Sequence, residues 1–280
     1  MDWRSETFVA STTDIPRHPG MPLRFERPSA LAFLLYALGV GVLVWSLDGT
    51  GWSLAELATG LPALGDFFSR AWPPSLERLP SLSSALIETF QMAVAGTVVG
   101  ALISIPLAVL SARNLLGGRV ANAMARGIVA ILRTVPDLVW ALIFVIAVGL
   151  GPFAGTLAIA VDTAGFCGRF FAEAMEDVDK GPAEALQAQG VRRIDTIFCA
   201  VMPAATPAFI TTTLFALEKA VRSSVVLGLV GAGGIGLELK VAMDMFDYPT
   251  AATIILMIFG LVVIVEQVGA HTRTRVMDGH

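Results

Sequence analysis

Charged residues are scarce in this sequence, at 15% of its 280 residues. A soluble domain usually carries about a quarter. Hydrophobic residues make up 55% of the chain, and they stand in long blocks rather than mixed with polar residues. A bilayer can accommodate such blocks and water cannot. The composition therefore excludes an ordinary soluble protein, and the net charge of −4, with no clustered basic patch, gives no sign of nucleic-acid binding.

Cysteine and histidine are also rare. The two cysteines, Cys167 and Cys199, lack metal-ligand spacing, and no histidine lies close to either of them in the sequence. The three histidines, His18, His271 and His280, stand in the two tails. We therefore expect two small free thiols, no disulfide, and no metal or catalytic site built from these residues.

Nucleotide-binding motifs are missing as well. No phosphate-binding loop ending in Gly-Lys-Ser or Gly-Lys-Thr occurs. The run Gly231–Gly236 does satisfy the spacing G-x-G-x-x-G, but a hydrophobic helix precedes it instead of the strand of a soluble βαβ unit. We therefore expect this chain to bind no nucleotide and no other cofactor.

Six hydrophobic stretches are long enough to cross a membrane as helices, near residues 31–47, 84–111, 128–150, 153–171, 204–229 and 250–270. Pro106 and Pro136 interrupt the second and third, and Gly96 and Gly100 form a small-xxx-small pair in the second. The sequence predicts an all-α polytopic membrane protein with about six transmembrane helices. Its predicted parts are a tail at 1–29, a first helix and outer segment at 30–83, a core at 84–270 with a polar loop near 173–203, and a tail at 271–280.

The segment between the first two stretches mixes aromatic and charged residues. Residues 61–74 predict either a short helix at the membrane interface or a plain loop. Arginine and lysine are concentrated in both tails and in the loops after the second and fourth stretches, whereas the other loops carry only Arg70, Arg78 and Lys240. Because positive loops stay inside the cell, both termini are predicted to be cytoplasmic.

The polar loop after the fourth stretch predicts two short helices. Residues 184–190 form an amphipathic pattern that ends at Gly190, and a second short helix follows before Pro203 at the membrane entrance. Such an element can lie on a cytosolic partner and transmit force into the bundle. From the residues alone, an ordinary surface helix and turn is the preferred interpretation.

The same loop resembles the coupling loop of binding-protein-dependent ABC importer permeases. That pattern is Glu-Ala-Ala, three residues, Gly, nine residues, then Ile-x-Leu-Pro. Glu184, Ala185, Gly190 and Pro203 match it with the spacing intact, whereas Leu186, Ala200 and Met202 depart from it with apolar or small residues. In the family this loop docks in a groove of the ATPase subunit.

Four further segments, 88–93, 132–141, 149–155 and 226–236, together resemble the phosphonate-importer permeases and, more weakly, their phosphite relatives. The resemblance runs from about residue 60 to the C-terminal tail. It implies a type I ABC importer permease fold in the bacterial inner membrane and alternating access of one path. The implied partners are a second copy of the chain, two ATPase subunits that bind ATP and magnesium, and a periplasmic or lipoprotein phosphonate-binding protein.

Two alternatives to a phosphonate importer stay open. An importer permease of the same class for phosphate or methionine would share the coupling loop. A secondary transporter or channel would have no ATPase, and therefore no use for such a loop.

Ionisable residues within the stretches are candidates for the translocation path, because charge in a bilayer usually faces a bundle interior or water. The candidates are Glu218, Arg222, Ser223 and Ser224 in the fifth stretch, with Arg133 and Asp137 beside Pro136. Arg222 is expected to attract a small anion transiently. The alternative is that Glu218 neutralises Arg222 and Asp137 neutralises Arg133, each four residues away.

The glycine run after the fifth stretch permits a tight turn or a close helix crossing. Gly231, Gly233, Gly234 and Gly236 are expected to form part of an outer gate where the binding protein docks. The alternative is that they simply end the fifth helix.

Overall fold

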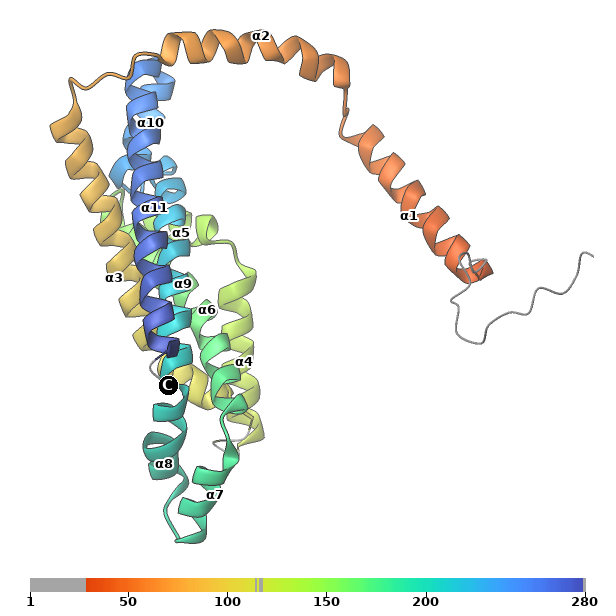
Figure 1. Cartoon of the computed structure of the whole chain (residues 1–280), viewed down its shortest axis with the longest axis vertical. Coiled ribbons are helices and arrows are strands. Elements are labelled where there is room, and N and C mark those ends of the chain that lie inside the picture. Colours follow the sequence, from red (N-terminus) through yellow and green to blue (C-terminus); the bar gives the residue numbers. More distant parts are fainter. Residues whose placement is uncertain (1–28, 114, 116–117, 279–280) are drawn as a thin grey trace, which may run out of the picture. The chain divides into compact units, whose positions relative to one another are not determined.

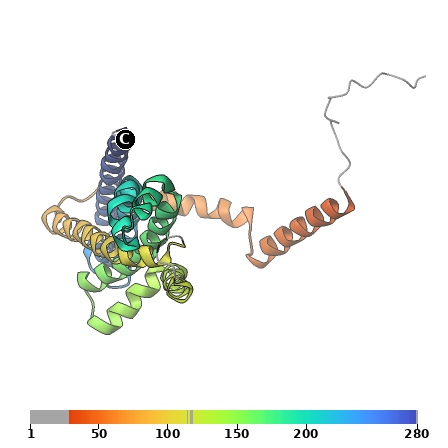
Figure 2. The same ribbon diagram turned by 90° about the horizontal axis from the view of Figure 1, so that it is seen from below.

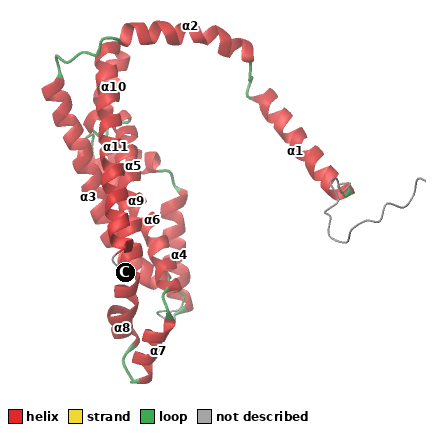
Figure 3. Cartoon of the chain, viewed as in Figure 1, coloured by secondary structure: helices red, strands yellow, loops and turns green. Residues whose placement is uncertain are grey.

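The computed structural model describes residues 29–113, 115 and 118–278. All regular structure in these ranges is helical (Figures 1 and 3), which confirms the predicted fold class. The elements are α1 (Ala30–Gly49), α2 (Leu54–Ala71), α3 (Leu79–Ser111), α4 (Arg119–Thr134), α5 (Asp137–Val148), α6 (Pro152–Asp177), α7 (Lys180–Ala188), α8 (Arg193–Thr196), the π-helix η1 (Ile197–Val201), α9 (Met202–Leu229), α10 (Gly234–Asp244) and α11 (Tyr248–Asp278). Most of the predicted tail at 1–29 lies outside the described residues, whereas the one at 271–280 continues α11 as far as Asp278.

The chain divides into two units at Pro62. In the described part of the first unit, α1 is apolar on every side and none of its residues is buried, as suits a helix surrounded by lipid. Its first turn is capped by the Ser29 hydroxyl, which accepts a hydrogen bond from the Ala32 N–H at 3.2 Å. The segment that could be a helix or a loop is the helix α2, which begins at Leu54.

The second unit is built around α6, against which α3, α4, α5 and α9 all pack. The small-xxx-small pair of α3 explains how closely α6 approaches it. A Cβ added at Gly96 would lie 2.6 Å from Ile159, and one added at Gly100 would lie 2.5 Å from the carbonyl oxygen of Ala160. The predicted close packing at these two glycines is thus confirmed.

Four helices of the described residues are long and apolar enough to cross a membrane: α1, α3, the continuous helix Arg193–Leu229, and α11. The third predicted span is interrupted at Pro136 as expected, but α4 and α5 meet at 91° and count as a fifth span only together. Pro136 is the reason, since the residue before a proline is pushed out of the helical region and Val135 has ψ 122°.

Helix α6 lies at the fourth predicted span but does not belong to this apolar set. It carries acidic and basic side chains such as Asp162 and Arg169, which form ion pairs at its surface. Its place among four other helices, rather than an apolar surface of its own, makes this helix compatible with a membrane protein.

Candidate functional site

The predicted helix, glycine turn and second helix are all present at the end of the bundle that Figure 2 views from below. Asp179 caps the N-terminus of α7, and its carboxylate accepts a hydrogen bond from the Gly181 N–H at 3.1 Å. The helix ends at Ala188, and Gly190, two residues further on, has φ +83°. The Gly190 N–H donates to the Gln187 carbonyl at 3.0 Å and the Val191 N–H to the Leu186 carbonyl at 3.2 Å. This pair of hydrogen bonds requires a residue in the left-handed conformation after the helix, and glycine adopts that conformation without steric cost.

The second helix runs into the membrane helix without a break. The segments α8, η1 and α9 form one helix of 37 residues, Arg193–Leu229. Pro203 lies in the first turn of α9 and has no N–H to donate, and the ladder just before it is shifted so that the Met202 N–H bonds to the Ile197 carbonyl. The sequence pattern did not predict this π-helix. Because the helix is continuous from Arg193 to Leu229, a displacement of α8 passes directly into α9.

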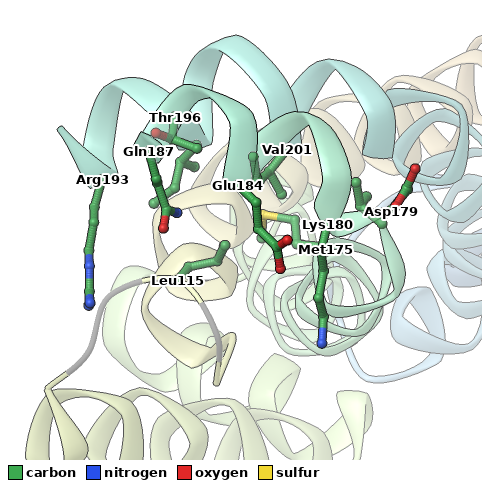
Figure 4. A pocket seen from close by; sticks show the side chains of 12 residues that line it. Leu115, Met175, Asp179, Lys180, Glu184, Gln187, Arg193, Thr196 and Val201 are labelled. Atoms are coloured by element: carbon green, nitrogen blue, oxygen red, sulfur yellow. The ribbon is translucent and has the colours of Figure 1, made fainter. Parts of the chain in front are cut away.

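One side of α7 and α8 faces a cavity of about 220 Å³ (Figure 4). Glu184 and Gln187 of α7 and Arg193 of α8 lie around it, and Leu115, Met175, Ile197 and Val201 are buried beneath. The inner side thus fixes the element to the hydrophobic cluster at this end of the bundle.

The other side of this element is exposed and largely apolar. Ala185 is exposed, Leu186 is half-buried, and Ile194 and Phe198 are 49% and 60% exposed. Beside them Arg192 donates to Asp195 at 2.8 Å, and this hydrogen bond and the aspartate's charge raise the pKa of Arg192. Small and apolar side chains on a fixed helix form a surface suited to a protein partner.

The charged residues of α9 do not pair with residues four positions away on the same helix. Arg222 forms its ion pair with Glu266, and Glu218 with Arg273, both on α11. The alternative of a Glu218–Arg222 pair is therefore wrong, because α11 packs along α9 and brings partners that the spacing within one helix cannot reveal. Glu218 is buried, whereas the side chains of Arg222 and Glu266 are 53% and 47% exposed.

The alternative of an Arg133–Asp137 pair is also wrong. The 91° bend separates the two side chains, although they stand four residues apart. Asp137 accepts a hydrogen bond from the Leu138 N–H at 2.9 Å, and the Arg133 guanidinium lies 6.0 Å from the ring of Phe170. Asp137 therefore accepts from the first turn of α5, its own helix, whereas Arg133 lies against an aromatic ring of α6.

Sequence reasoning missed a third charge pair on α9. Lys219 donates to Asp162 of α6 at 2.7 Å, across 57 residues of sequence. Asp162 inside an apolar stretch was a signal, but its partner was not predictable. Of the two serines, Ser223 is half-buried, and Ser224 is buried with its hydroxyl donating to Val221 of its own helix.

The glycine run forms a buried junction, which we call the glycine junction, between α9 and α10. Gly231, Gly233 and Gly234 have φ of +94°, +82° and +70°, and a Cβ at Gly233 would lie 2.8 Å from Glu88 and 3.1 Å from the backbone of Pro152. The run therefore both ends α9 and allows a close crossing. It lies inside the packed bundle, and its role as a gate stays a prediction.

The glycine junction joins segments that are distant in sequence. The Gly234 N–H donates to the Glu88 carboxylate at 2.9 Å and the Ile235 N–H to the Thr89 hydroxyl at 2.7 Å, so α3 caps α10 across 146 residues. The Gly151 N–H donates to the Gly231 carbonyl at 3.0 Å. Three of the segments that resemble phosphonate permeases thus meet here, and Glu88 and Thr89 acquire a role that their sequence context did not indicate.

The described residues contain no group of three or more His, Cys, Asp or Glu side chains placed to hold a metal ion. Cys167 is buried and Cys199 is exposed, and both are free.

Two transport permeases are similar to this chain in sequence. The phosphite transport system permease protein PtxC of Stutzerimonas stutzeri is 38% identical over 210 residues, which are 75% of this chain and 76% of that protein. The phosphate-import permease protein PhnE of Mycolicibacterium smegmatis is 36% identical over 225 residues, 80% of this chain and 42% of that protein.

Among solved structures, the inward-facing MetNI methionine ABC transporter matches with a TM-score of 0.63 at 22% identity, covering 72% of this chain and 99% of that one. This match supports the fold. Residues 104–277 match the family described as binding-protein-dependent transport system inner membrane component. The chain is a multi-pass membrane protein and belongs to that family.

Proposed function

We propose that this chain forms the membrane pore of an ATP-driven importer for phosphonate or phosphite. The observation that carries the proposal is the α7–α8 element, which has an exposed apolar side and is continuous with a membrane helix. A secondary transporter or channel has no use for such an element. The relatives that transport phosphite and phosphate, by their names, support a phosphorus oxyanion as the cargo.

The proposed assembly has two copies of this chain, two ATPase subunits and a soluble phosphonate-binding protein. The exposed side of α7 docks on the ATPase, which binds ATP and magnesium, and both termini lie in the cytoplasm with the arginine-rich segments. Closure of the ATPase dimer moves α7, and the unbroken helix from Arg193 to Leu229 carries this motion into the bundle. The glycine junction at the far end of α9 then acts in the outer gate, and hydrolysis resets the path inward.

Arg222 is the proposed contact for the anion in transit. Its guanidinium is half-exposed and its partner Glu266 lies at the same surface, so a phosphonate can compete with that carboxylate for two hydrogen bonds. The competition keeps binding weak, which allows release.

Replacing Arg222 by glutamine is therefore expected to lower the initial rate of uptake by about tenfold. Radiolabelled phosphonate uptake by cells that express the whole transporter measures this effect, with membrane content checked by immunoblot. Arg78→Gln is the matched control. Arg78 also forms an ion pair, with Glu238, but it was not a candidate for the translocation path. Uptake by the Arg222 variant at the wild-type rate would remove Arg222 from the path.

The substrate class is tested by ATPase stimulation of the complete complex in liposomes with its binding protein. We expect 2-aminoethylphosphonate or methylphosphonate to stimulate hydrolysis, with phosphite second. Stimulation by phosphate alone would support the phosphate alternative that the PhnE relative suggests. Stimulation by methionine alone would leave the importer architecture standing and overturn the proposed cargo.

A further inference from the structure

A second cavity lies between the inner ends of α3, α4 and α6. Its volume is about 400 Å³, and four arginines and two glutamates line it: Arg113, Arg126, Arg133, Arg169, Glu173 and Glu176. We call this cavity the arginine pocket. It falls within the size range of small-ligand sites, about 300–1,000 Å³. The proposed coupling element does not use it, and among its lining residues only Arg133 was a candidate for the translocation path.

The carboxylates of the arginine pocket neutralise only half of its arginines. Arg126 pairs with Glu176 at 2.6 Å, and Arg169 pairs with Glu173 at 2.7 Å. Among residues 29–113, 115 and 118–276, no carboxylate lies within 4.0 Å of the guanidinium of Arg113 or Arg133. The pocket therefore carries two positive charges that its own acids leave uncompensated.

A buried hydroxyl in the same pocket also lacks a partner. Ser111 lines the cavity and is only 3% exposed, and its Oγ makes no hydrogen bond. Its carbonyl oxygen, by contrast, is well satisfied, because it accepts from Asn122 at 2.7 Å and from the Arg126 Nε at 2.8 Å. A buried unpaired hydroxyl is uncommon in proteins and calls for an explanation, of which a bound ligand is one.

The distribution of polar and apolar side chains around α4 places the arginine pocket beside the bilayer. Arg126 and Arg133 lie seven residues apart on the side that lines the cavity, while Val120, Met124, Ile128 and Ile131 of the same helix are exposed. This exposed apolar side suits contact with lipid chains. A basic pocket between membrane helices on the cytoplasmic side is a setting in which anionic headgroups bind.

We propose that the arginine pocket binds a phosphate or phosphonate group. The two uncompensated guanidinium groups can each donate a pair of hydrogen bonds to its oxygens, and the Ser111 hydroxyl can supply a further donor. The group belongs either to the headgroup of an anionic lipid or to a free oxyanion in the cytoplasm. Both sources present the same chemistry to the pocket.

Two binding measurements on the purified full chain in neutral detergent distinguish these sources. Calorimetric titration with inorganic phosphate and with methylphosphonate tests for a free oxyanion. Native mass spectrometry after incubation with phosphatidylglycerol, compared with phosphatidylcholine, tests for a lipid headgroup. We expect binding in one of the two measurements.

The variants are the double change Arg113→Gln with Arg133→Gln, and the single change Ser111→Ala. The double variant is expected to weaken binding at least about tenfold and the serine variant about three- to tenfold. Arg78→Gln, at the other end of α3, is the matched control and should bind as the wild type does. The serine variant removes only one oxygen and keeps the test valid if the double variant does not fold.

Binding of either probe that both variants weaken supports the arginine pocket, and the probe identifies the source. Absence of binding in both measurements, or equal binding by the wild type and the variants, overturns the proposal. Neither measurement depends on transport, so the proposed function is unaffected by that outcome.

Discussion

Replacing Ala185 by arginine is expected to reduce uptake to background while the chain still folds and inserts. Ala185 lies on the exposed side of α7, where an arginine fits the helix without disturbing any buried contact. If this side docks on the ATPase, a long charged side chain there must separate the two surfaces or be buried without a partner. Burial of an unpaired charge costs several kcal/mol, which is enough to dissociate a typical interface. Uptake of labelled phosphonate and co-purification of the ATPase should both fall at least about tenfold.

The matched control for this change is Ala55→Arg on α2, another exposed alanine on a helix that does not belong to the coupling element. It should leave uptake and co-purification at the wild-type level. Wild-type uptake by the Ala185 variant would show that this side of α7 makes no functional contact, and the proposed docking would then be wrong.

Replacing Gly236 by alanine is expected to destabilise the protein by about 1–3 kcal/mol or more. The added Cβ would overlap the carbonyl oxygen of Val225 and lie 3.0 Å from the Cα of Gly228, so α9 and α10 must move apart. Both neighbours are backbone atoms, which cannot relieve the clash by a rotamer change. Such a shift also pulls α10 away from Glu88 and Thr89, which cap its first turn. Thermal unfolding of the purified chain should show a clear fall in midpoint, and uptake should fall with it.

Gly260→Ala provides the opposite expectation. Gly260 lies within α11, and an added Cβ there would meet no heavy atom within 4 Å. Alanine favours a helix over glycine by about 1 kcal/mol, so this variant should be as stable as the wild type or more so. Equal stability of the two alanine variants would contradict the close crossing of α9 and α10.

The elements that sequence analysis predicted well depend on local signals. The coupling element was predicted because Gly190 ends one helix and Pro203 begins the next segment within 13 residues of each other. The close packing of Gly96 and Gly100 on α6 was predicted because small residues four apart leave room for another backbone. Both inferences need no knowledge of what lies elsewhere in the fold.

The failures involve tertiary partners. Glu218 and Arg222 share a helix side, yet each pairs with a residue of α11 that lies more than 40 positions away. The break at Pro136 was seen in the sequence, but not the 91° angle that separates Arg133 from Asp137. Likewise, the sequence around Glu88 does not indicate that this residue caps α10. The packing of the helices determines these contacts, and local patterns in a single sequence do not predict that packing.

ATP-dependent uptake into liposomes tests most directly whether a separate ATPase drives this pore. Two preparations are compared, one with this chain, its ATPase and its binding protein, and the other without the ATPase. The account predicts that labelled phosphonate accumulates only in the first, and only when ATP is present on the side of the ATPase. Accumulation in the second, driven by an ion gradient or by the phosphonate gradient alone, would contradict it and identify a secondary transporter or channel.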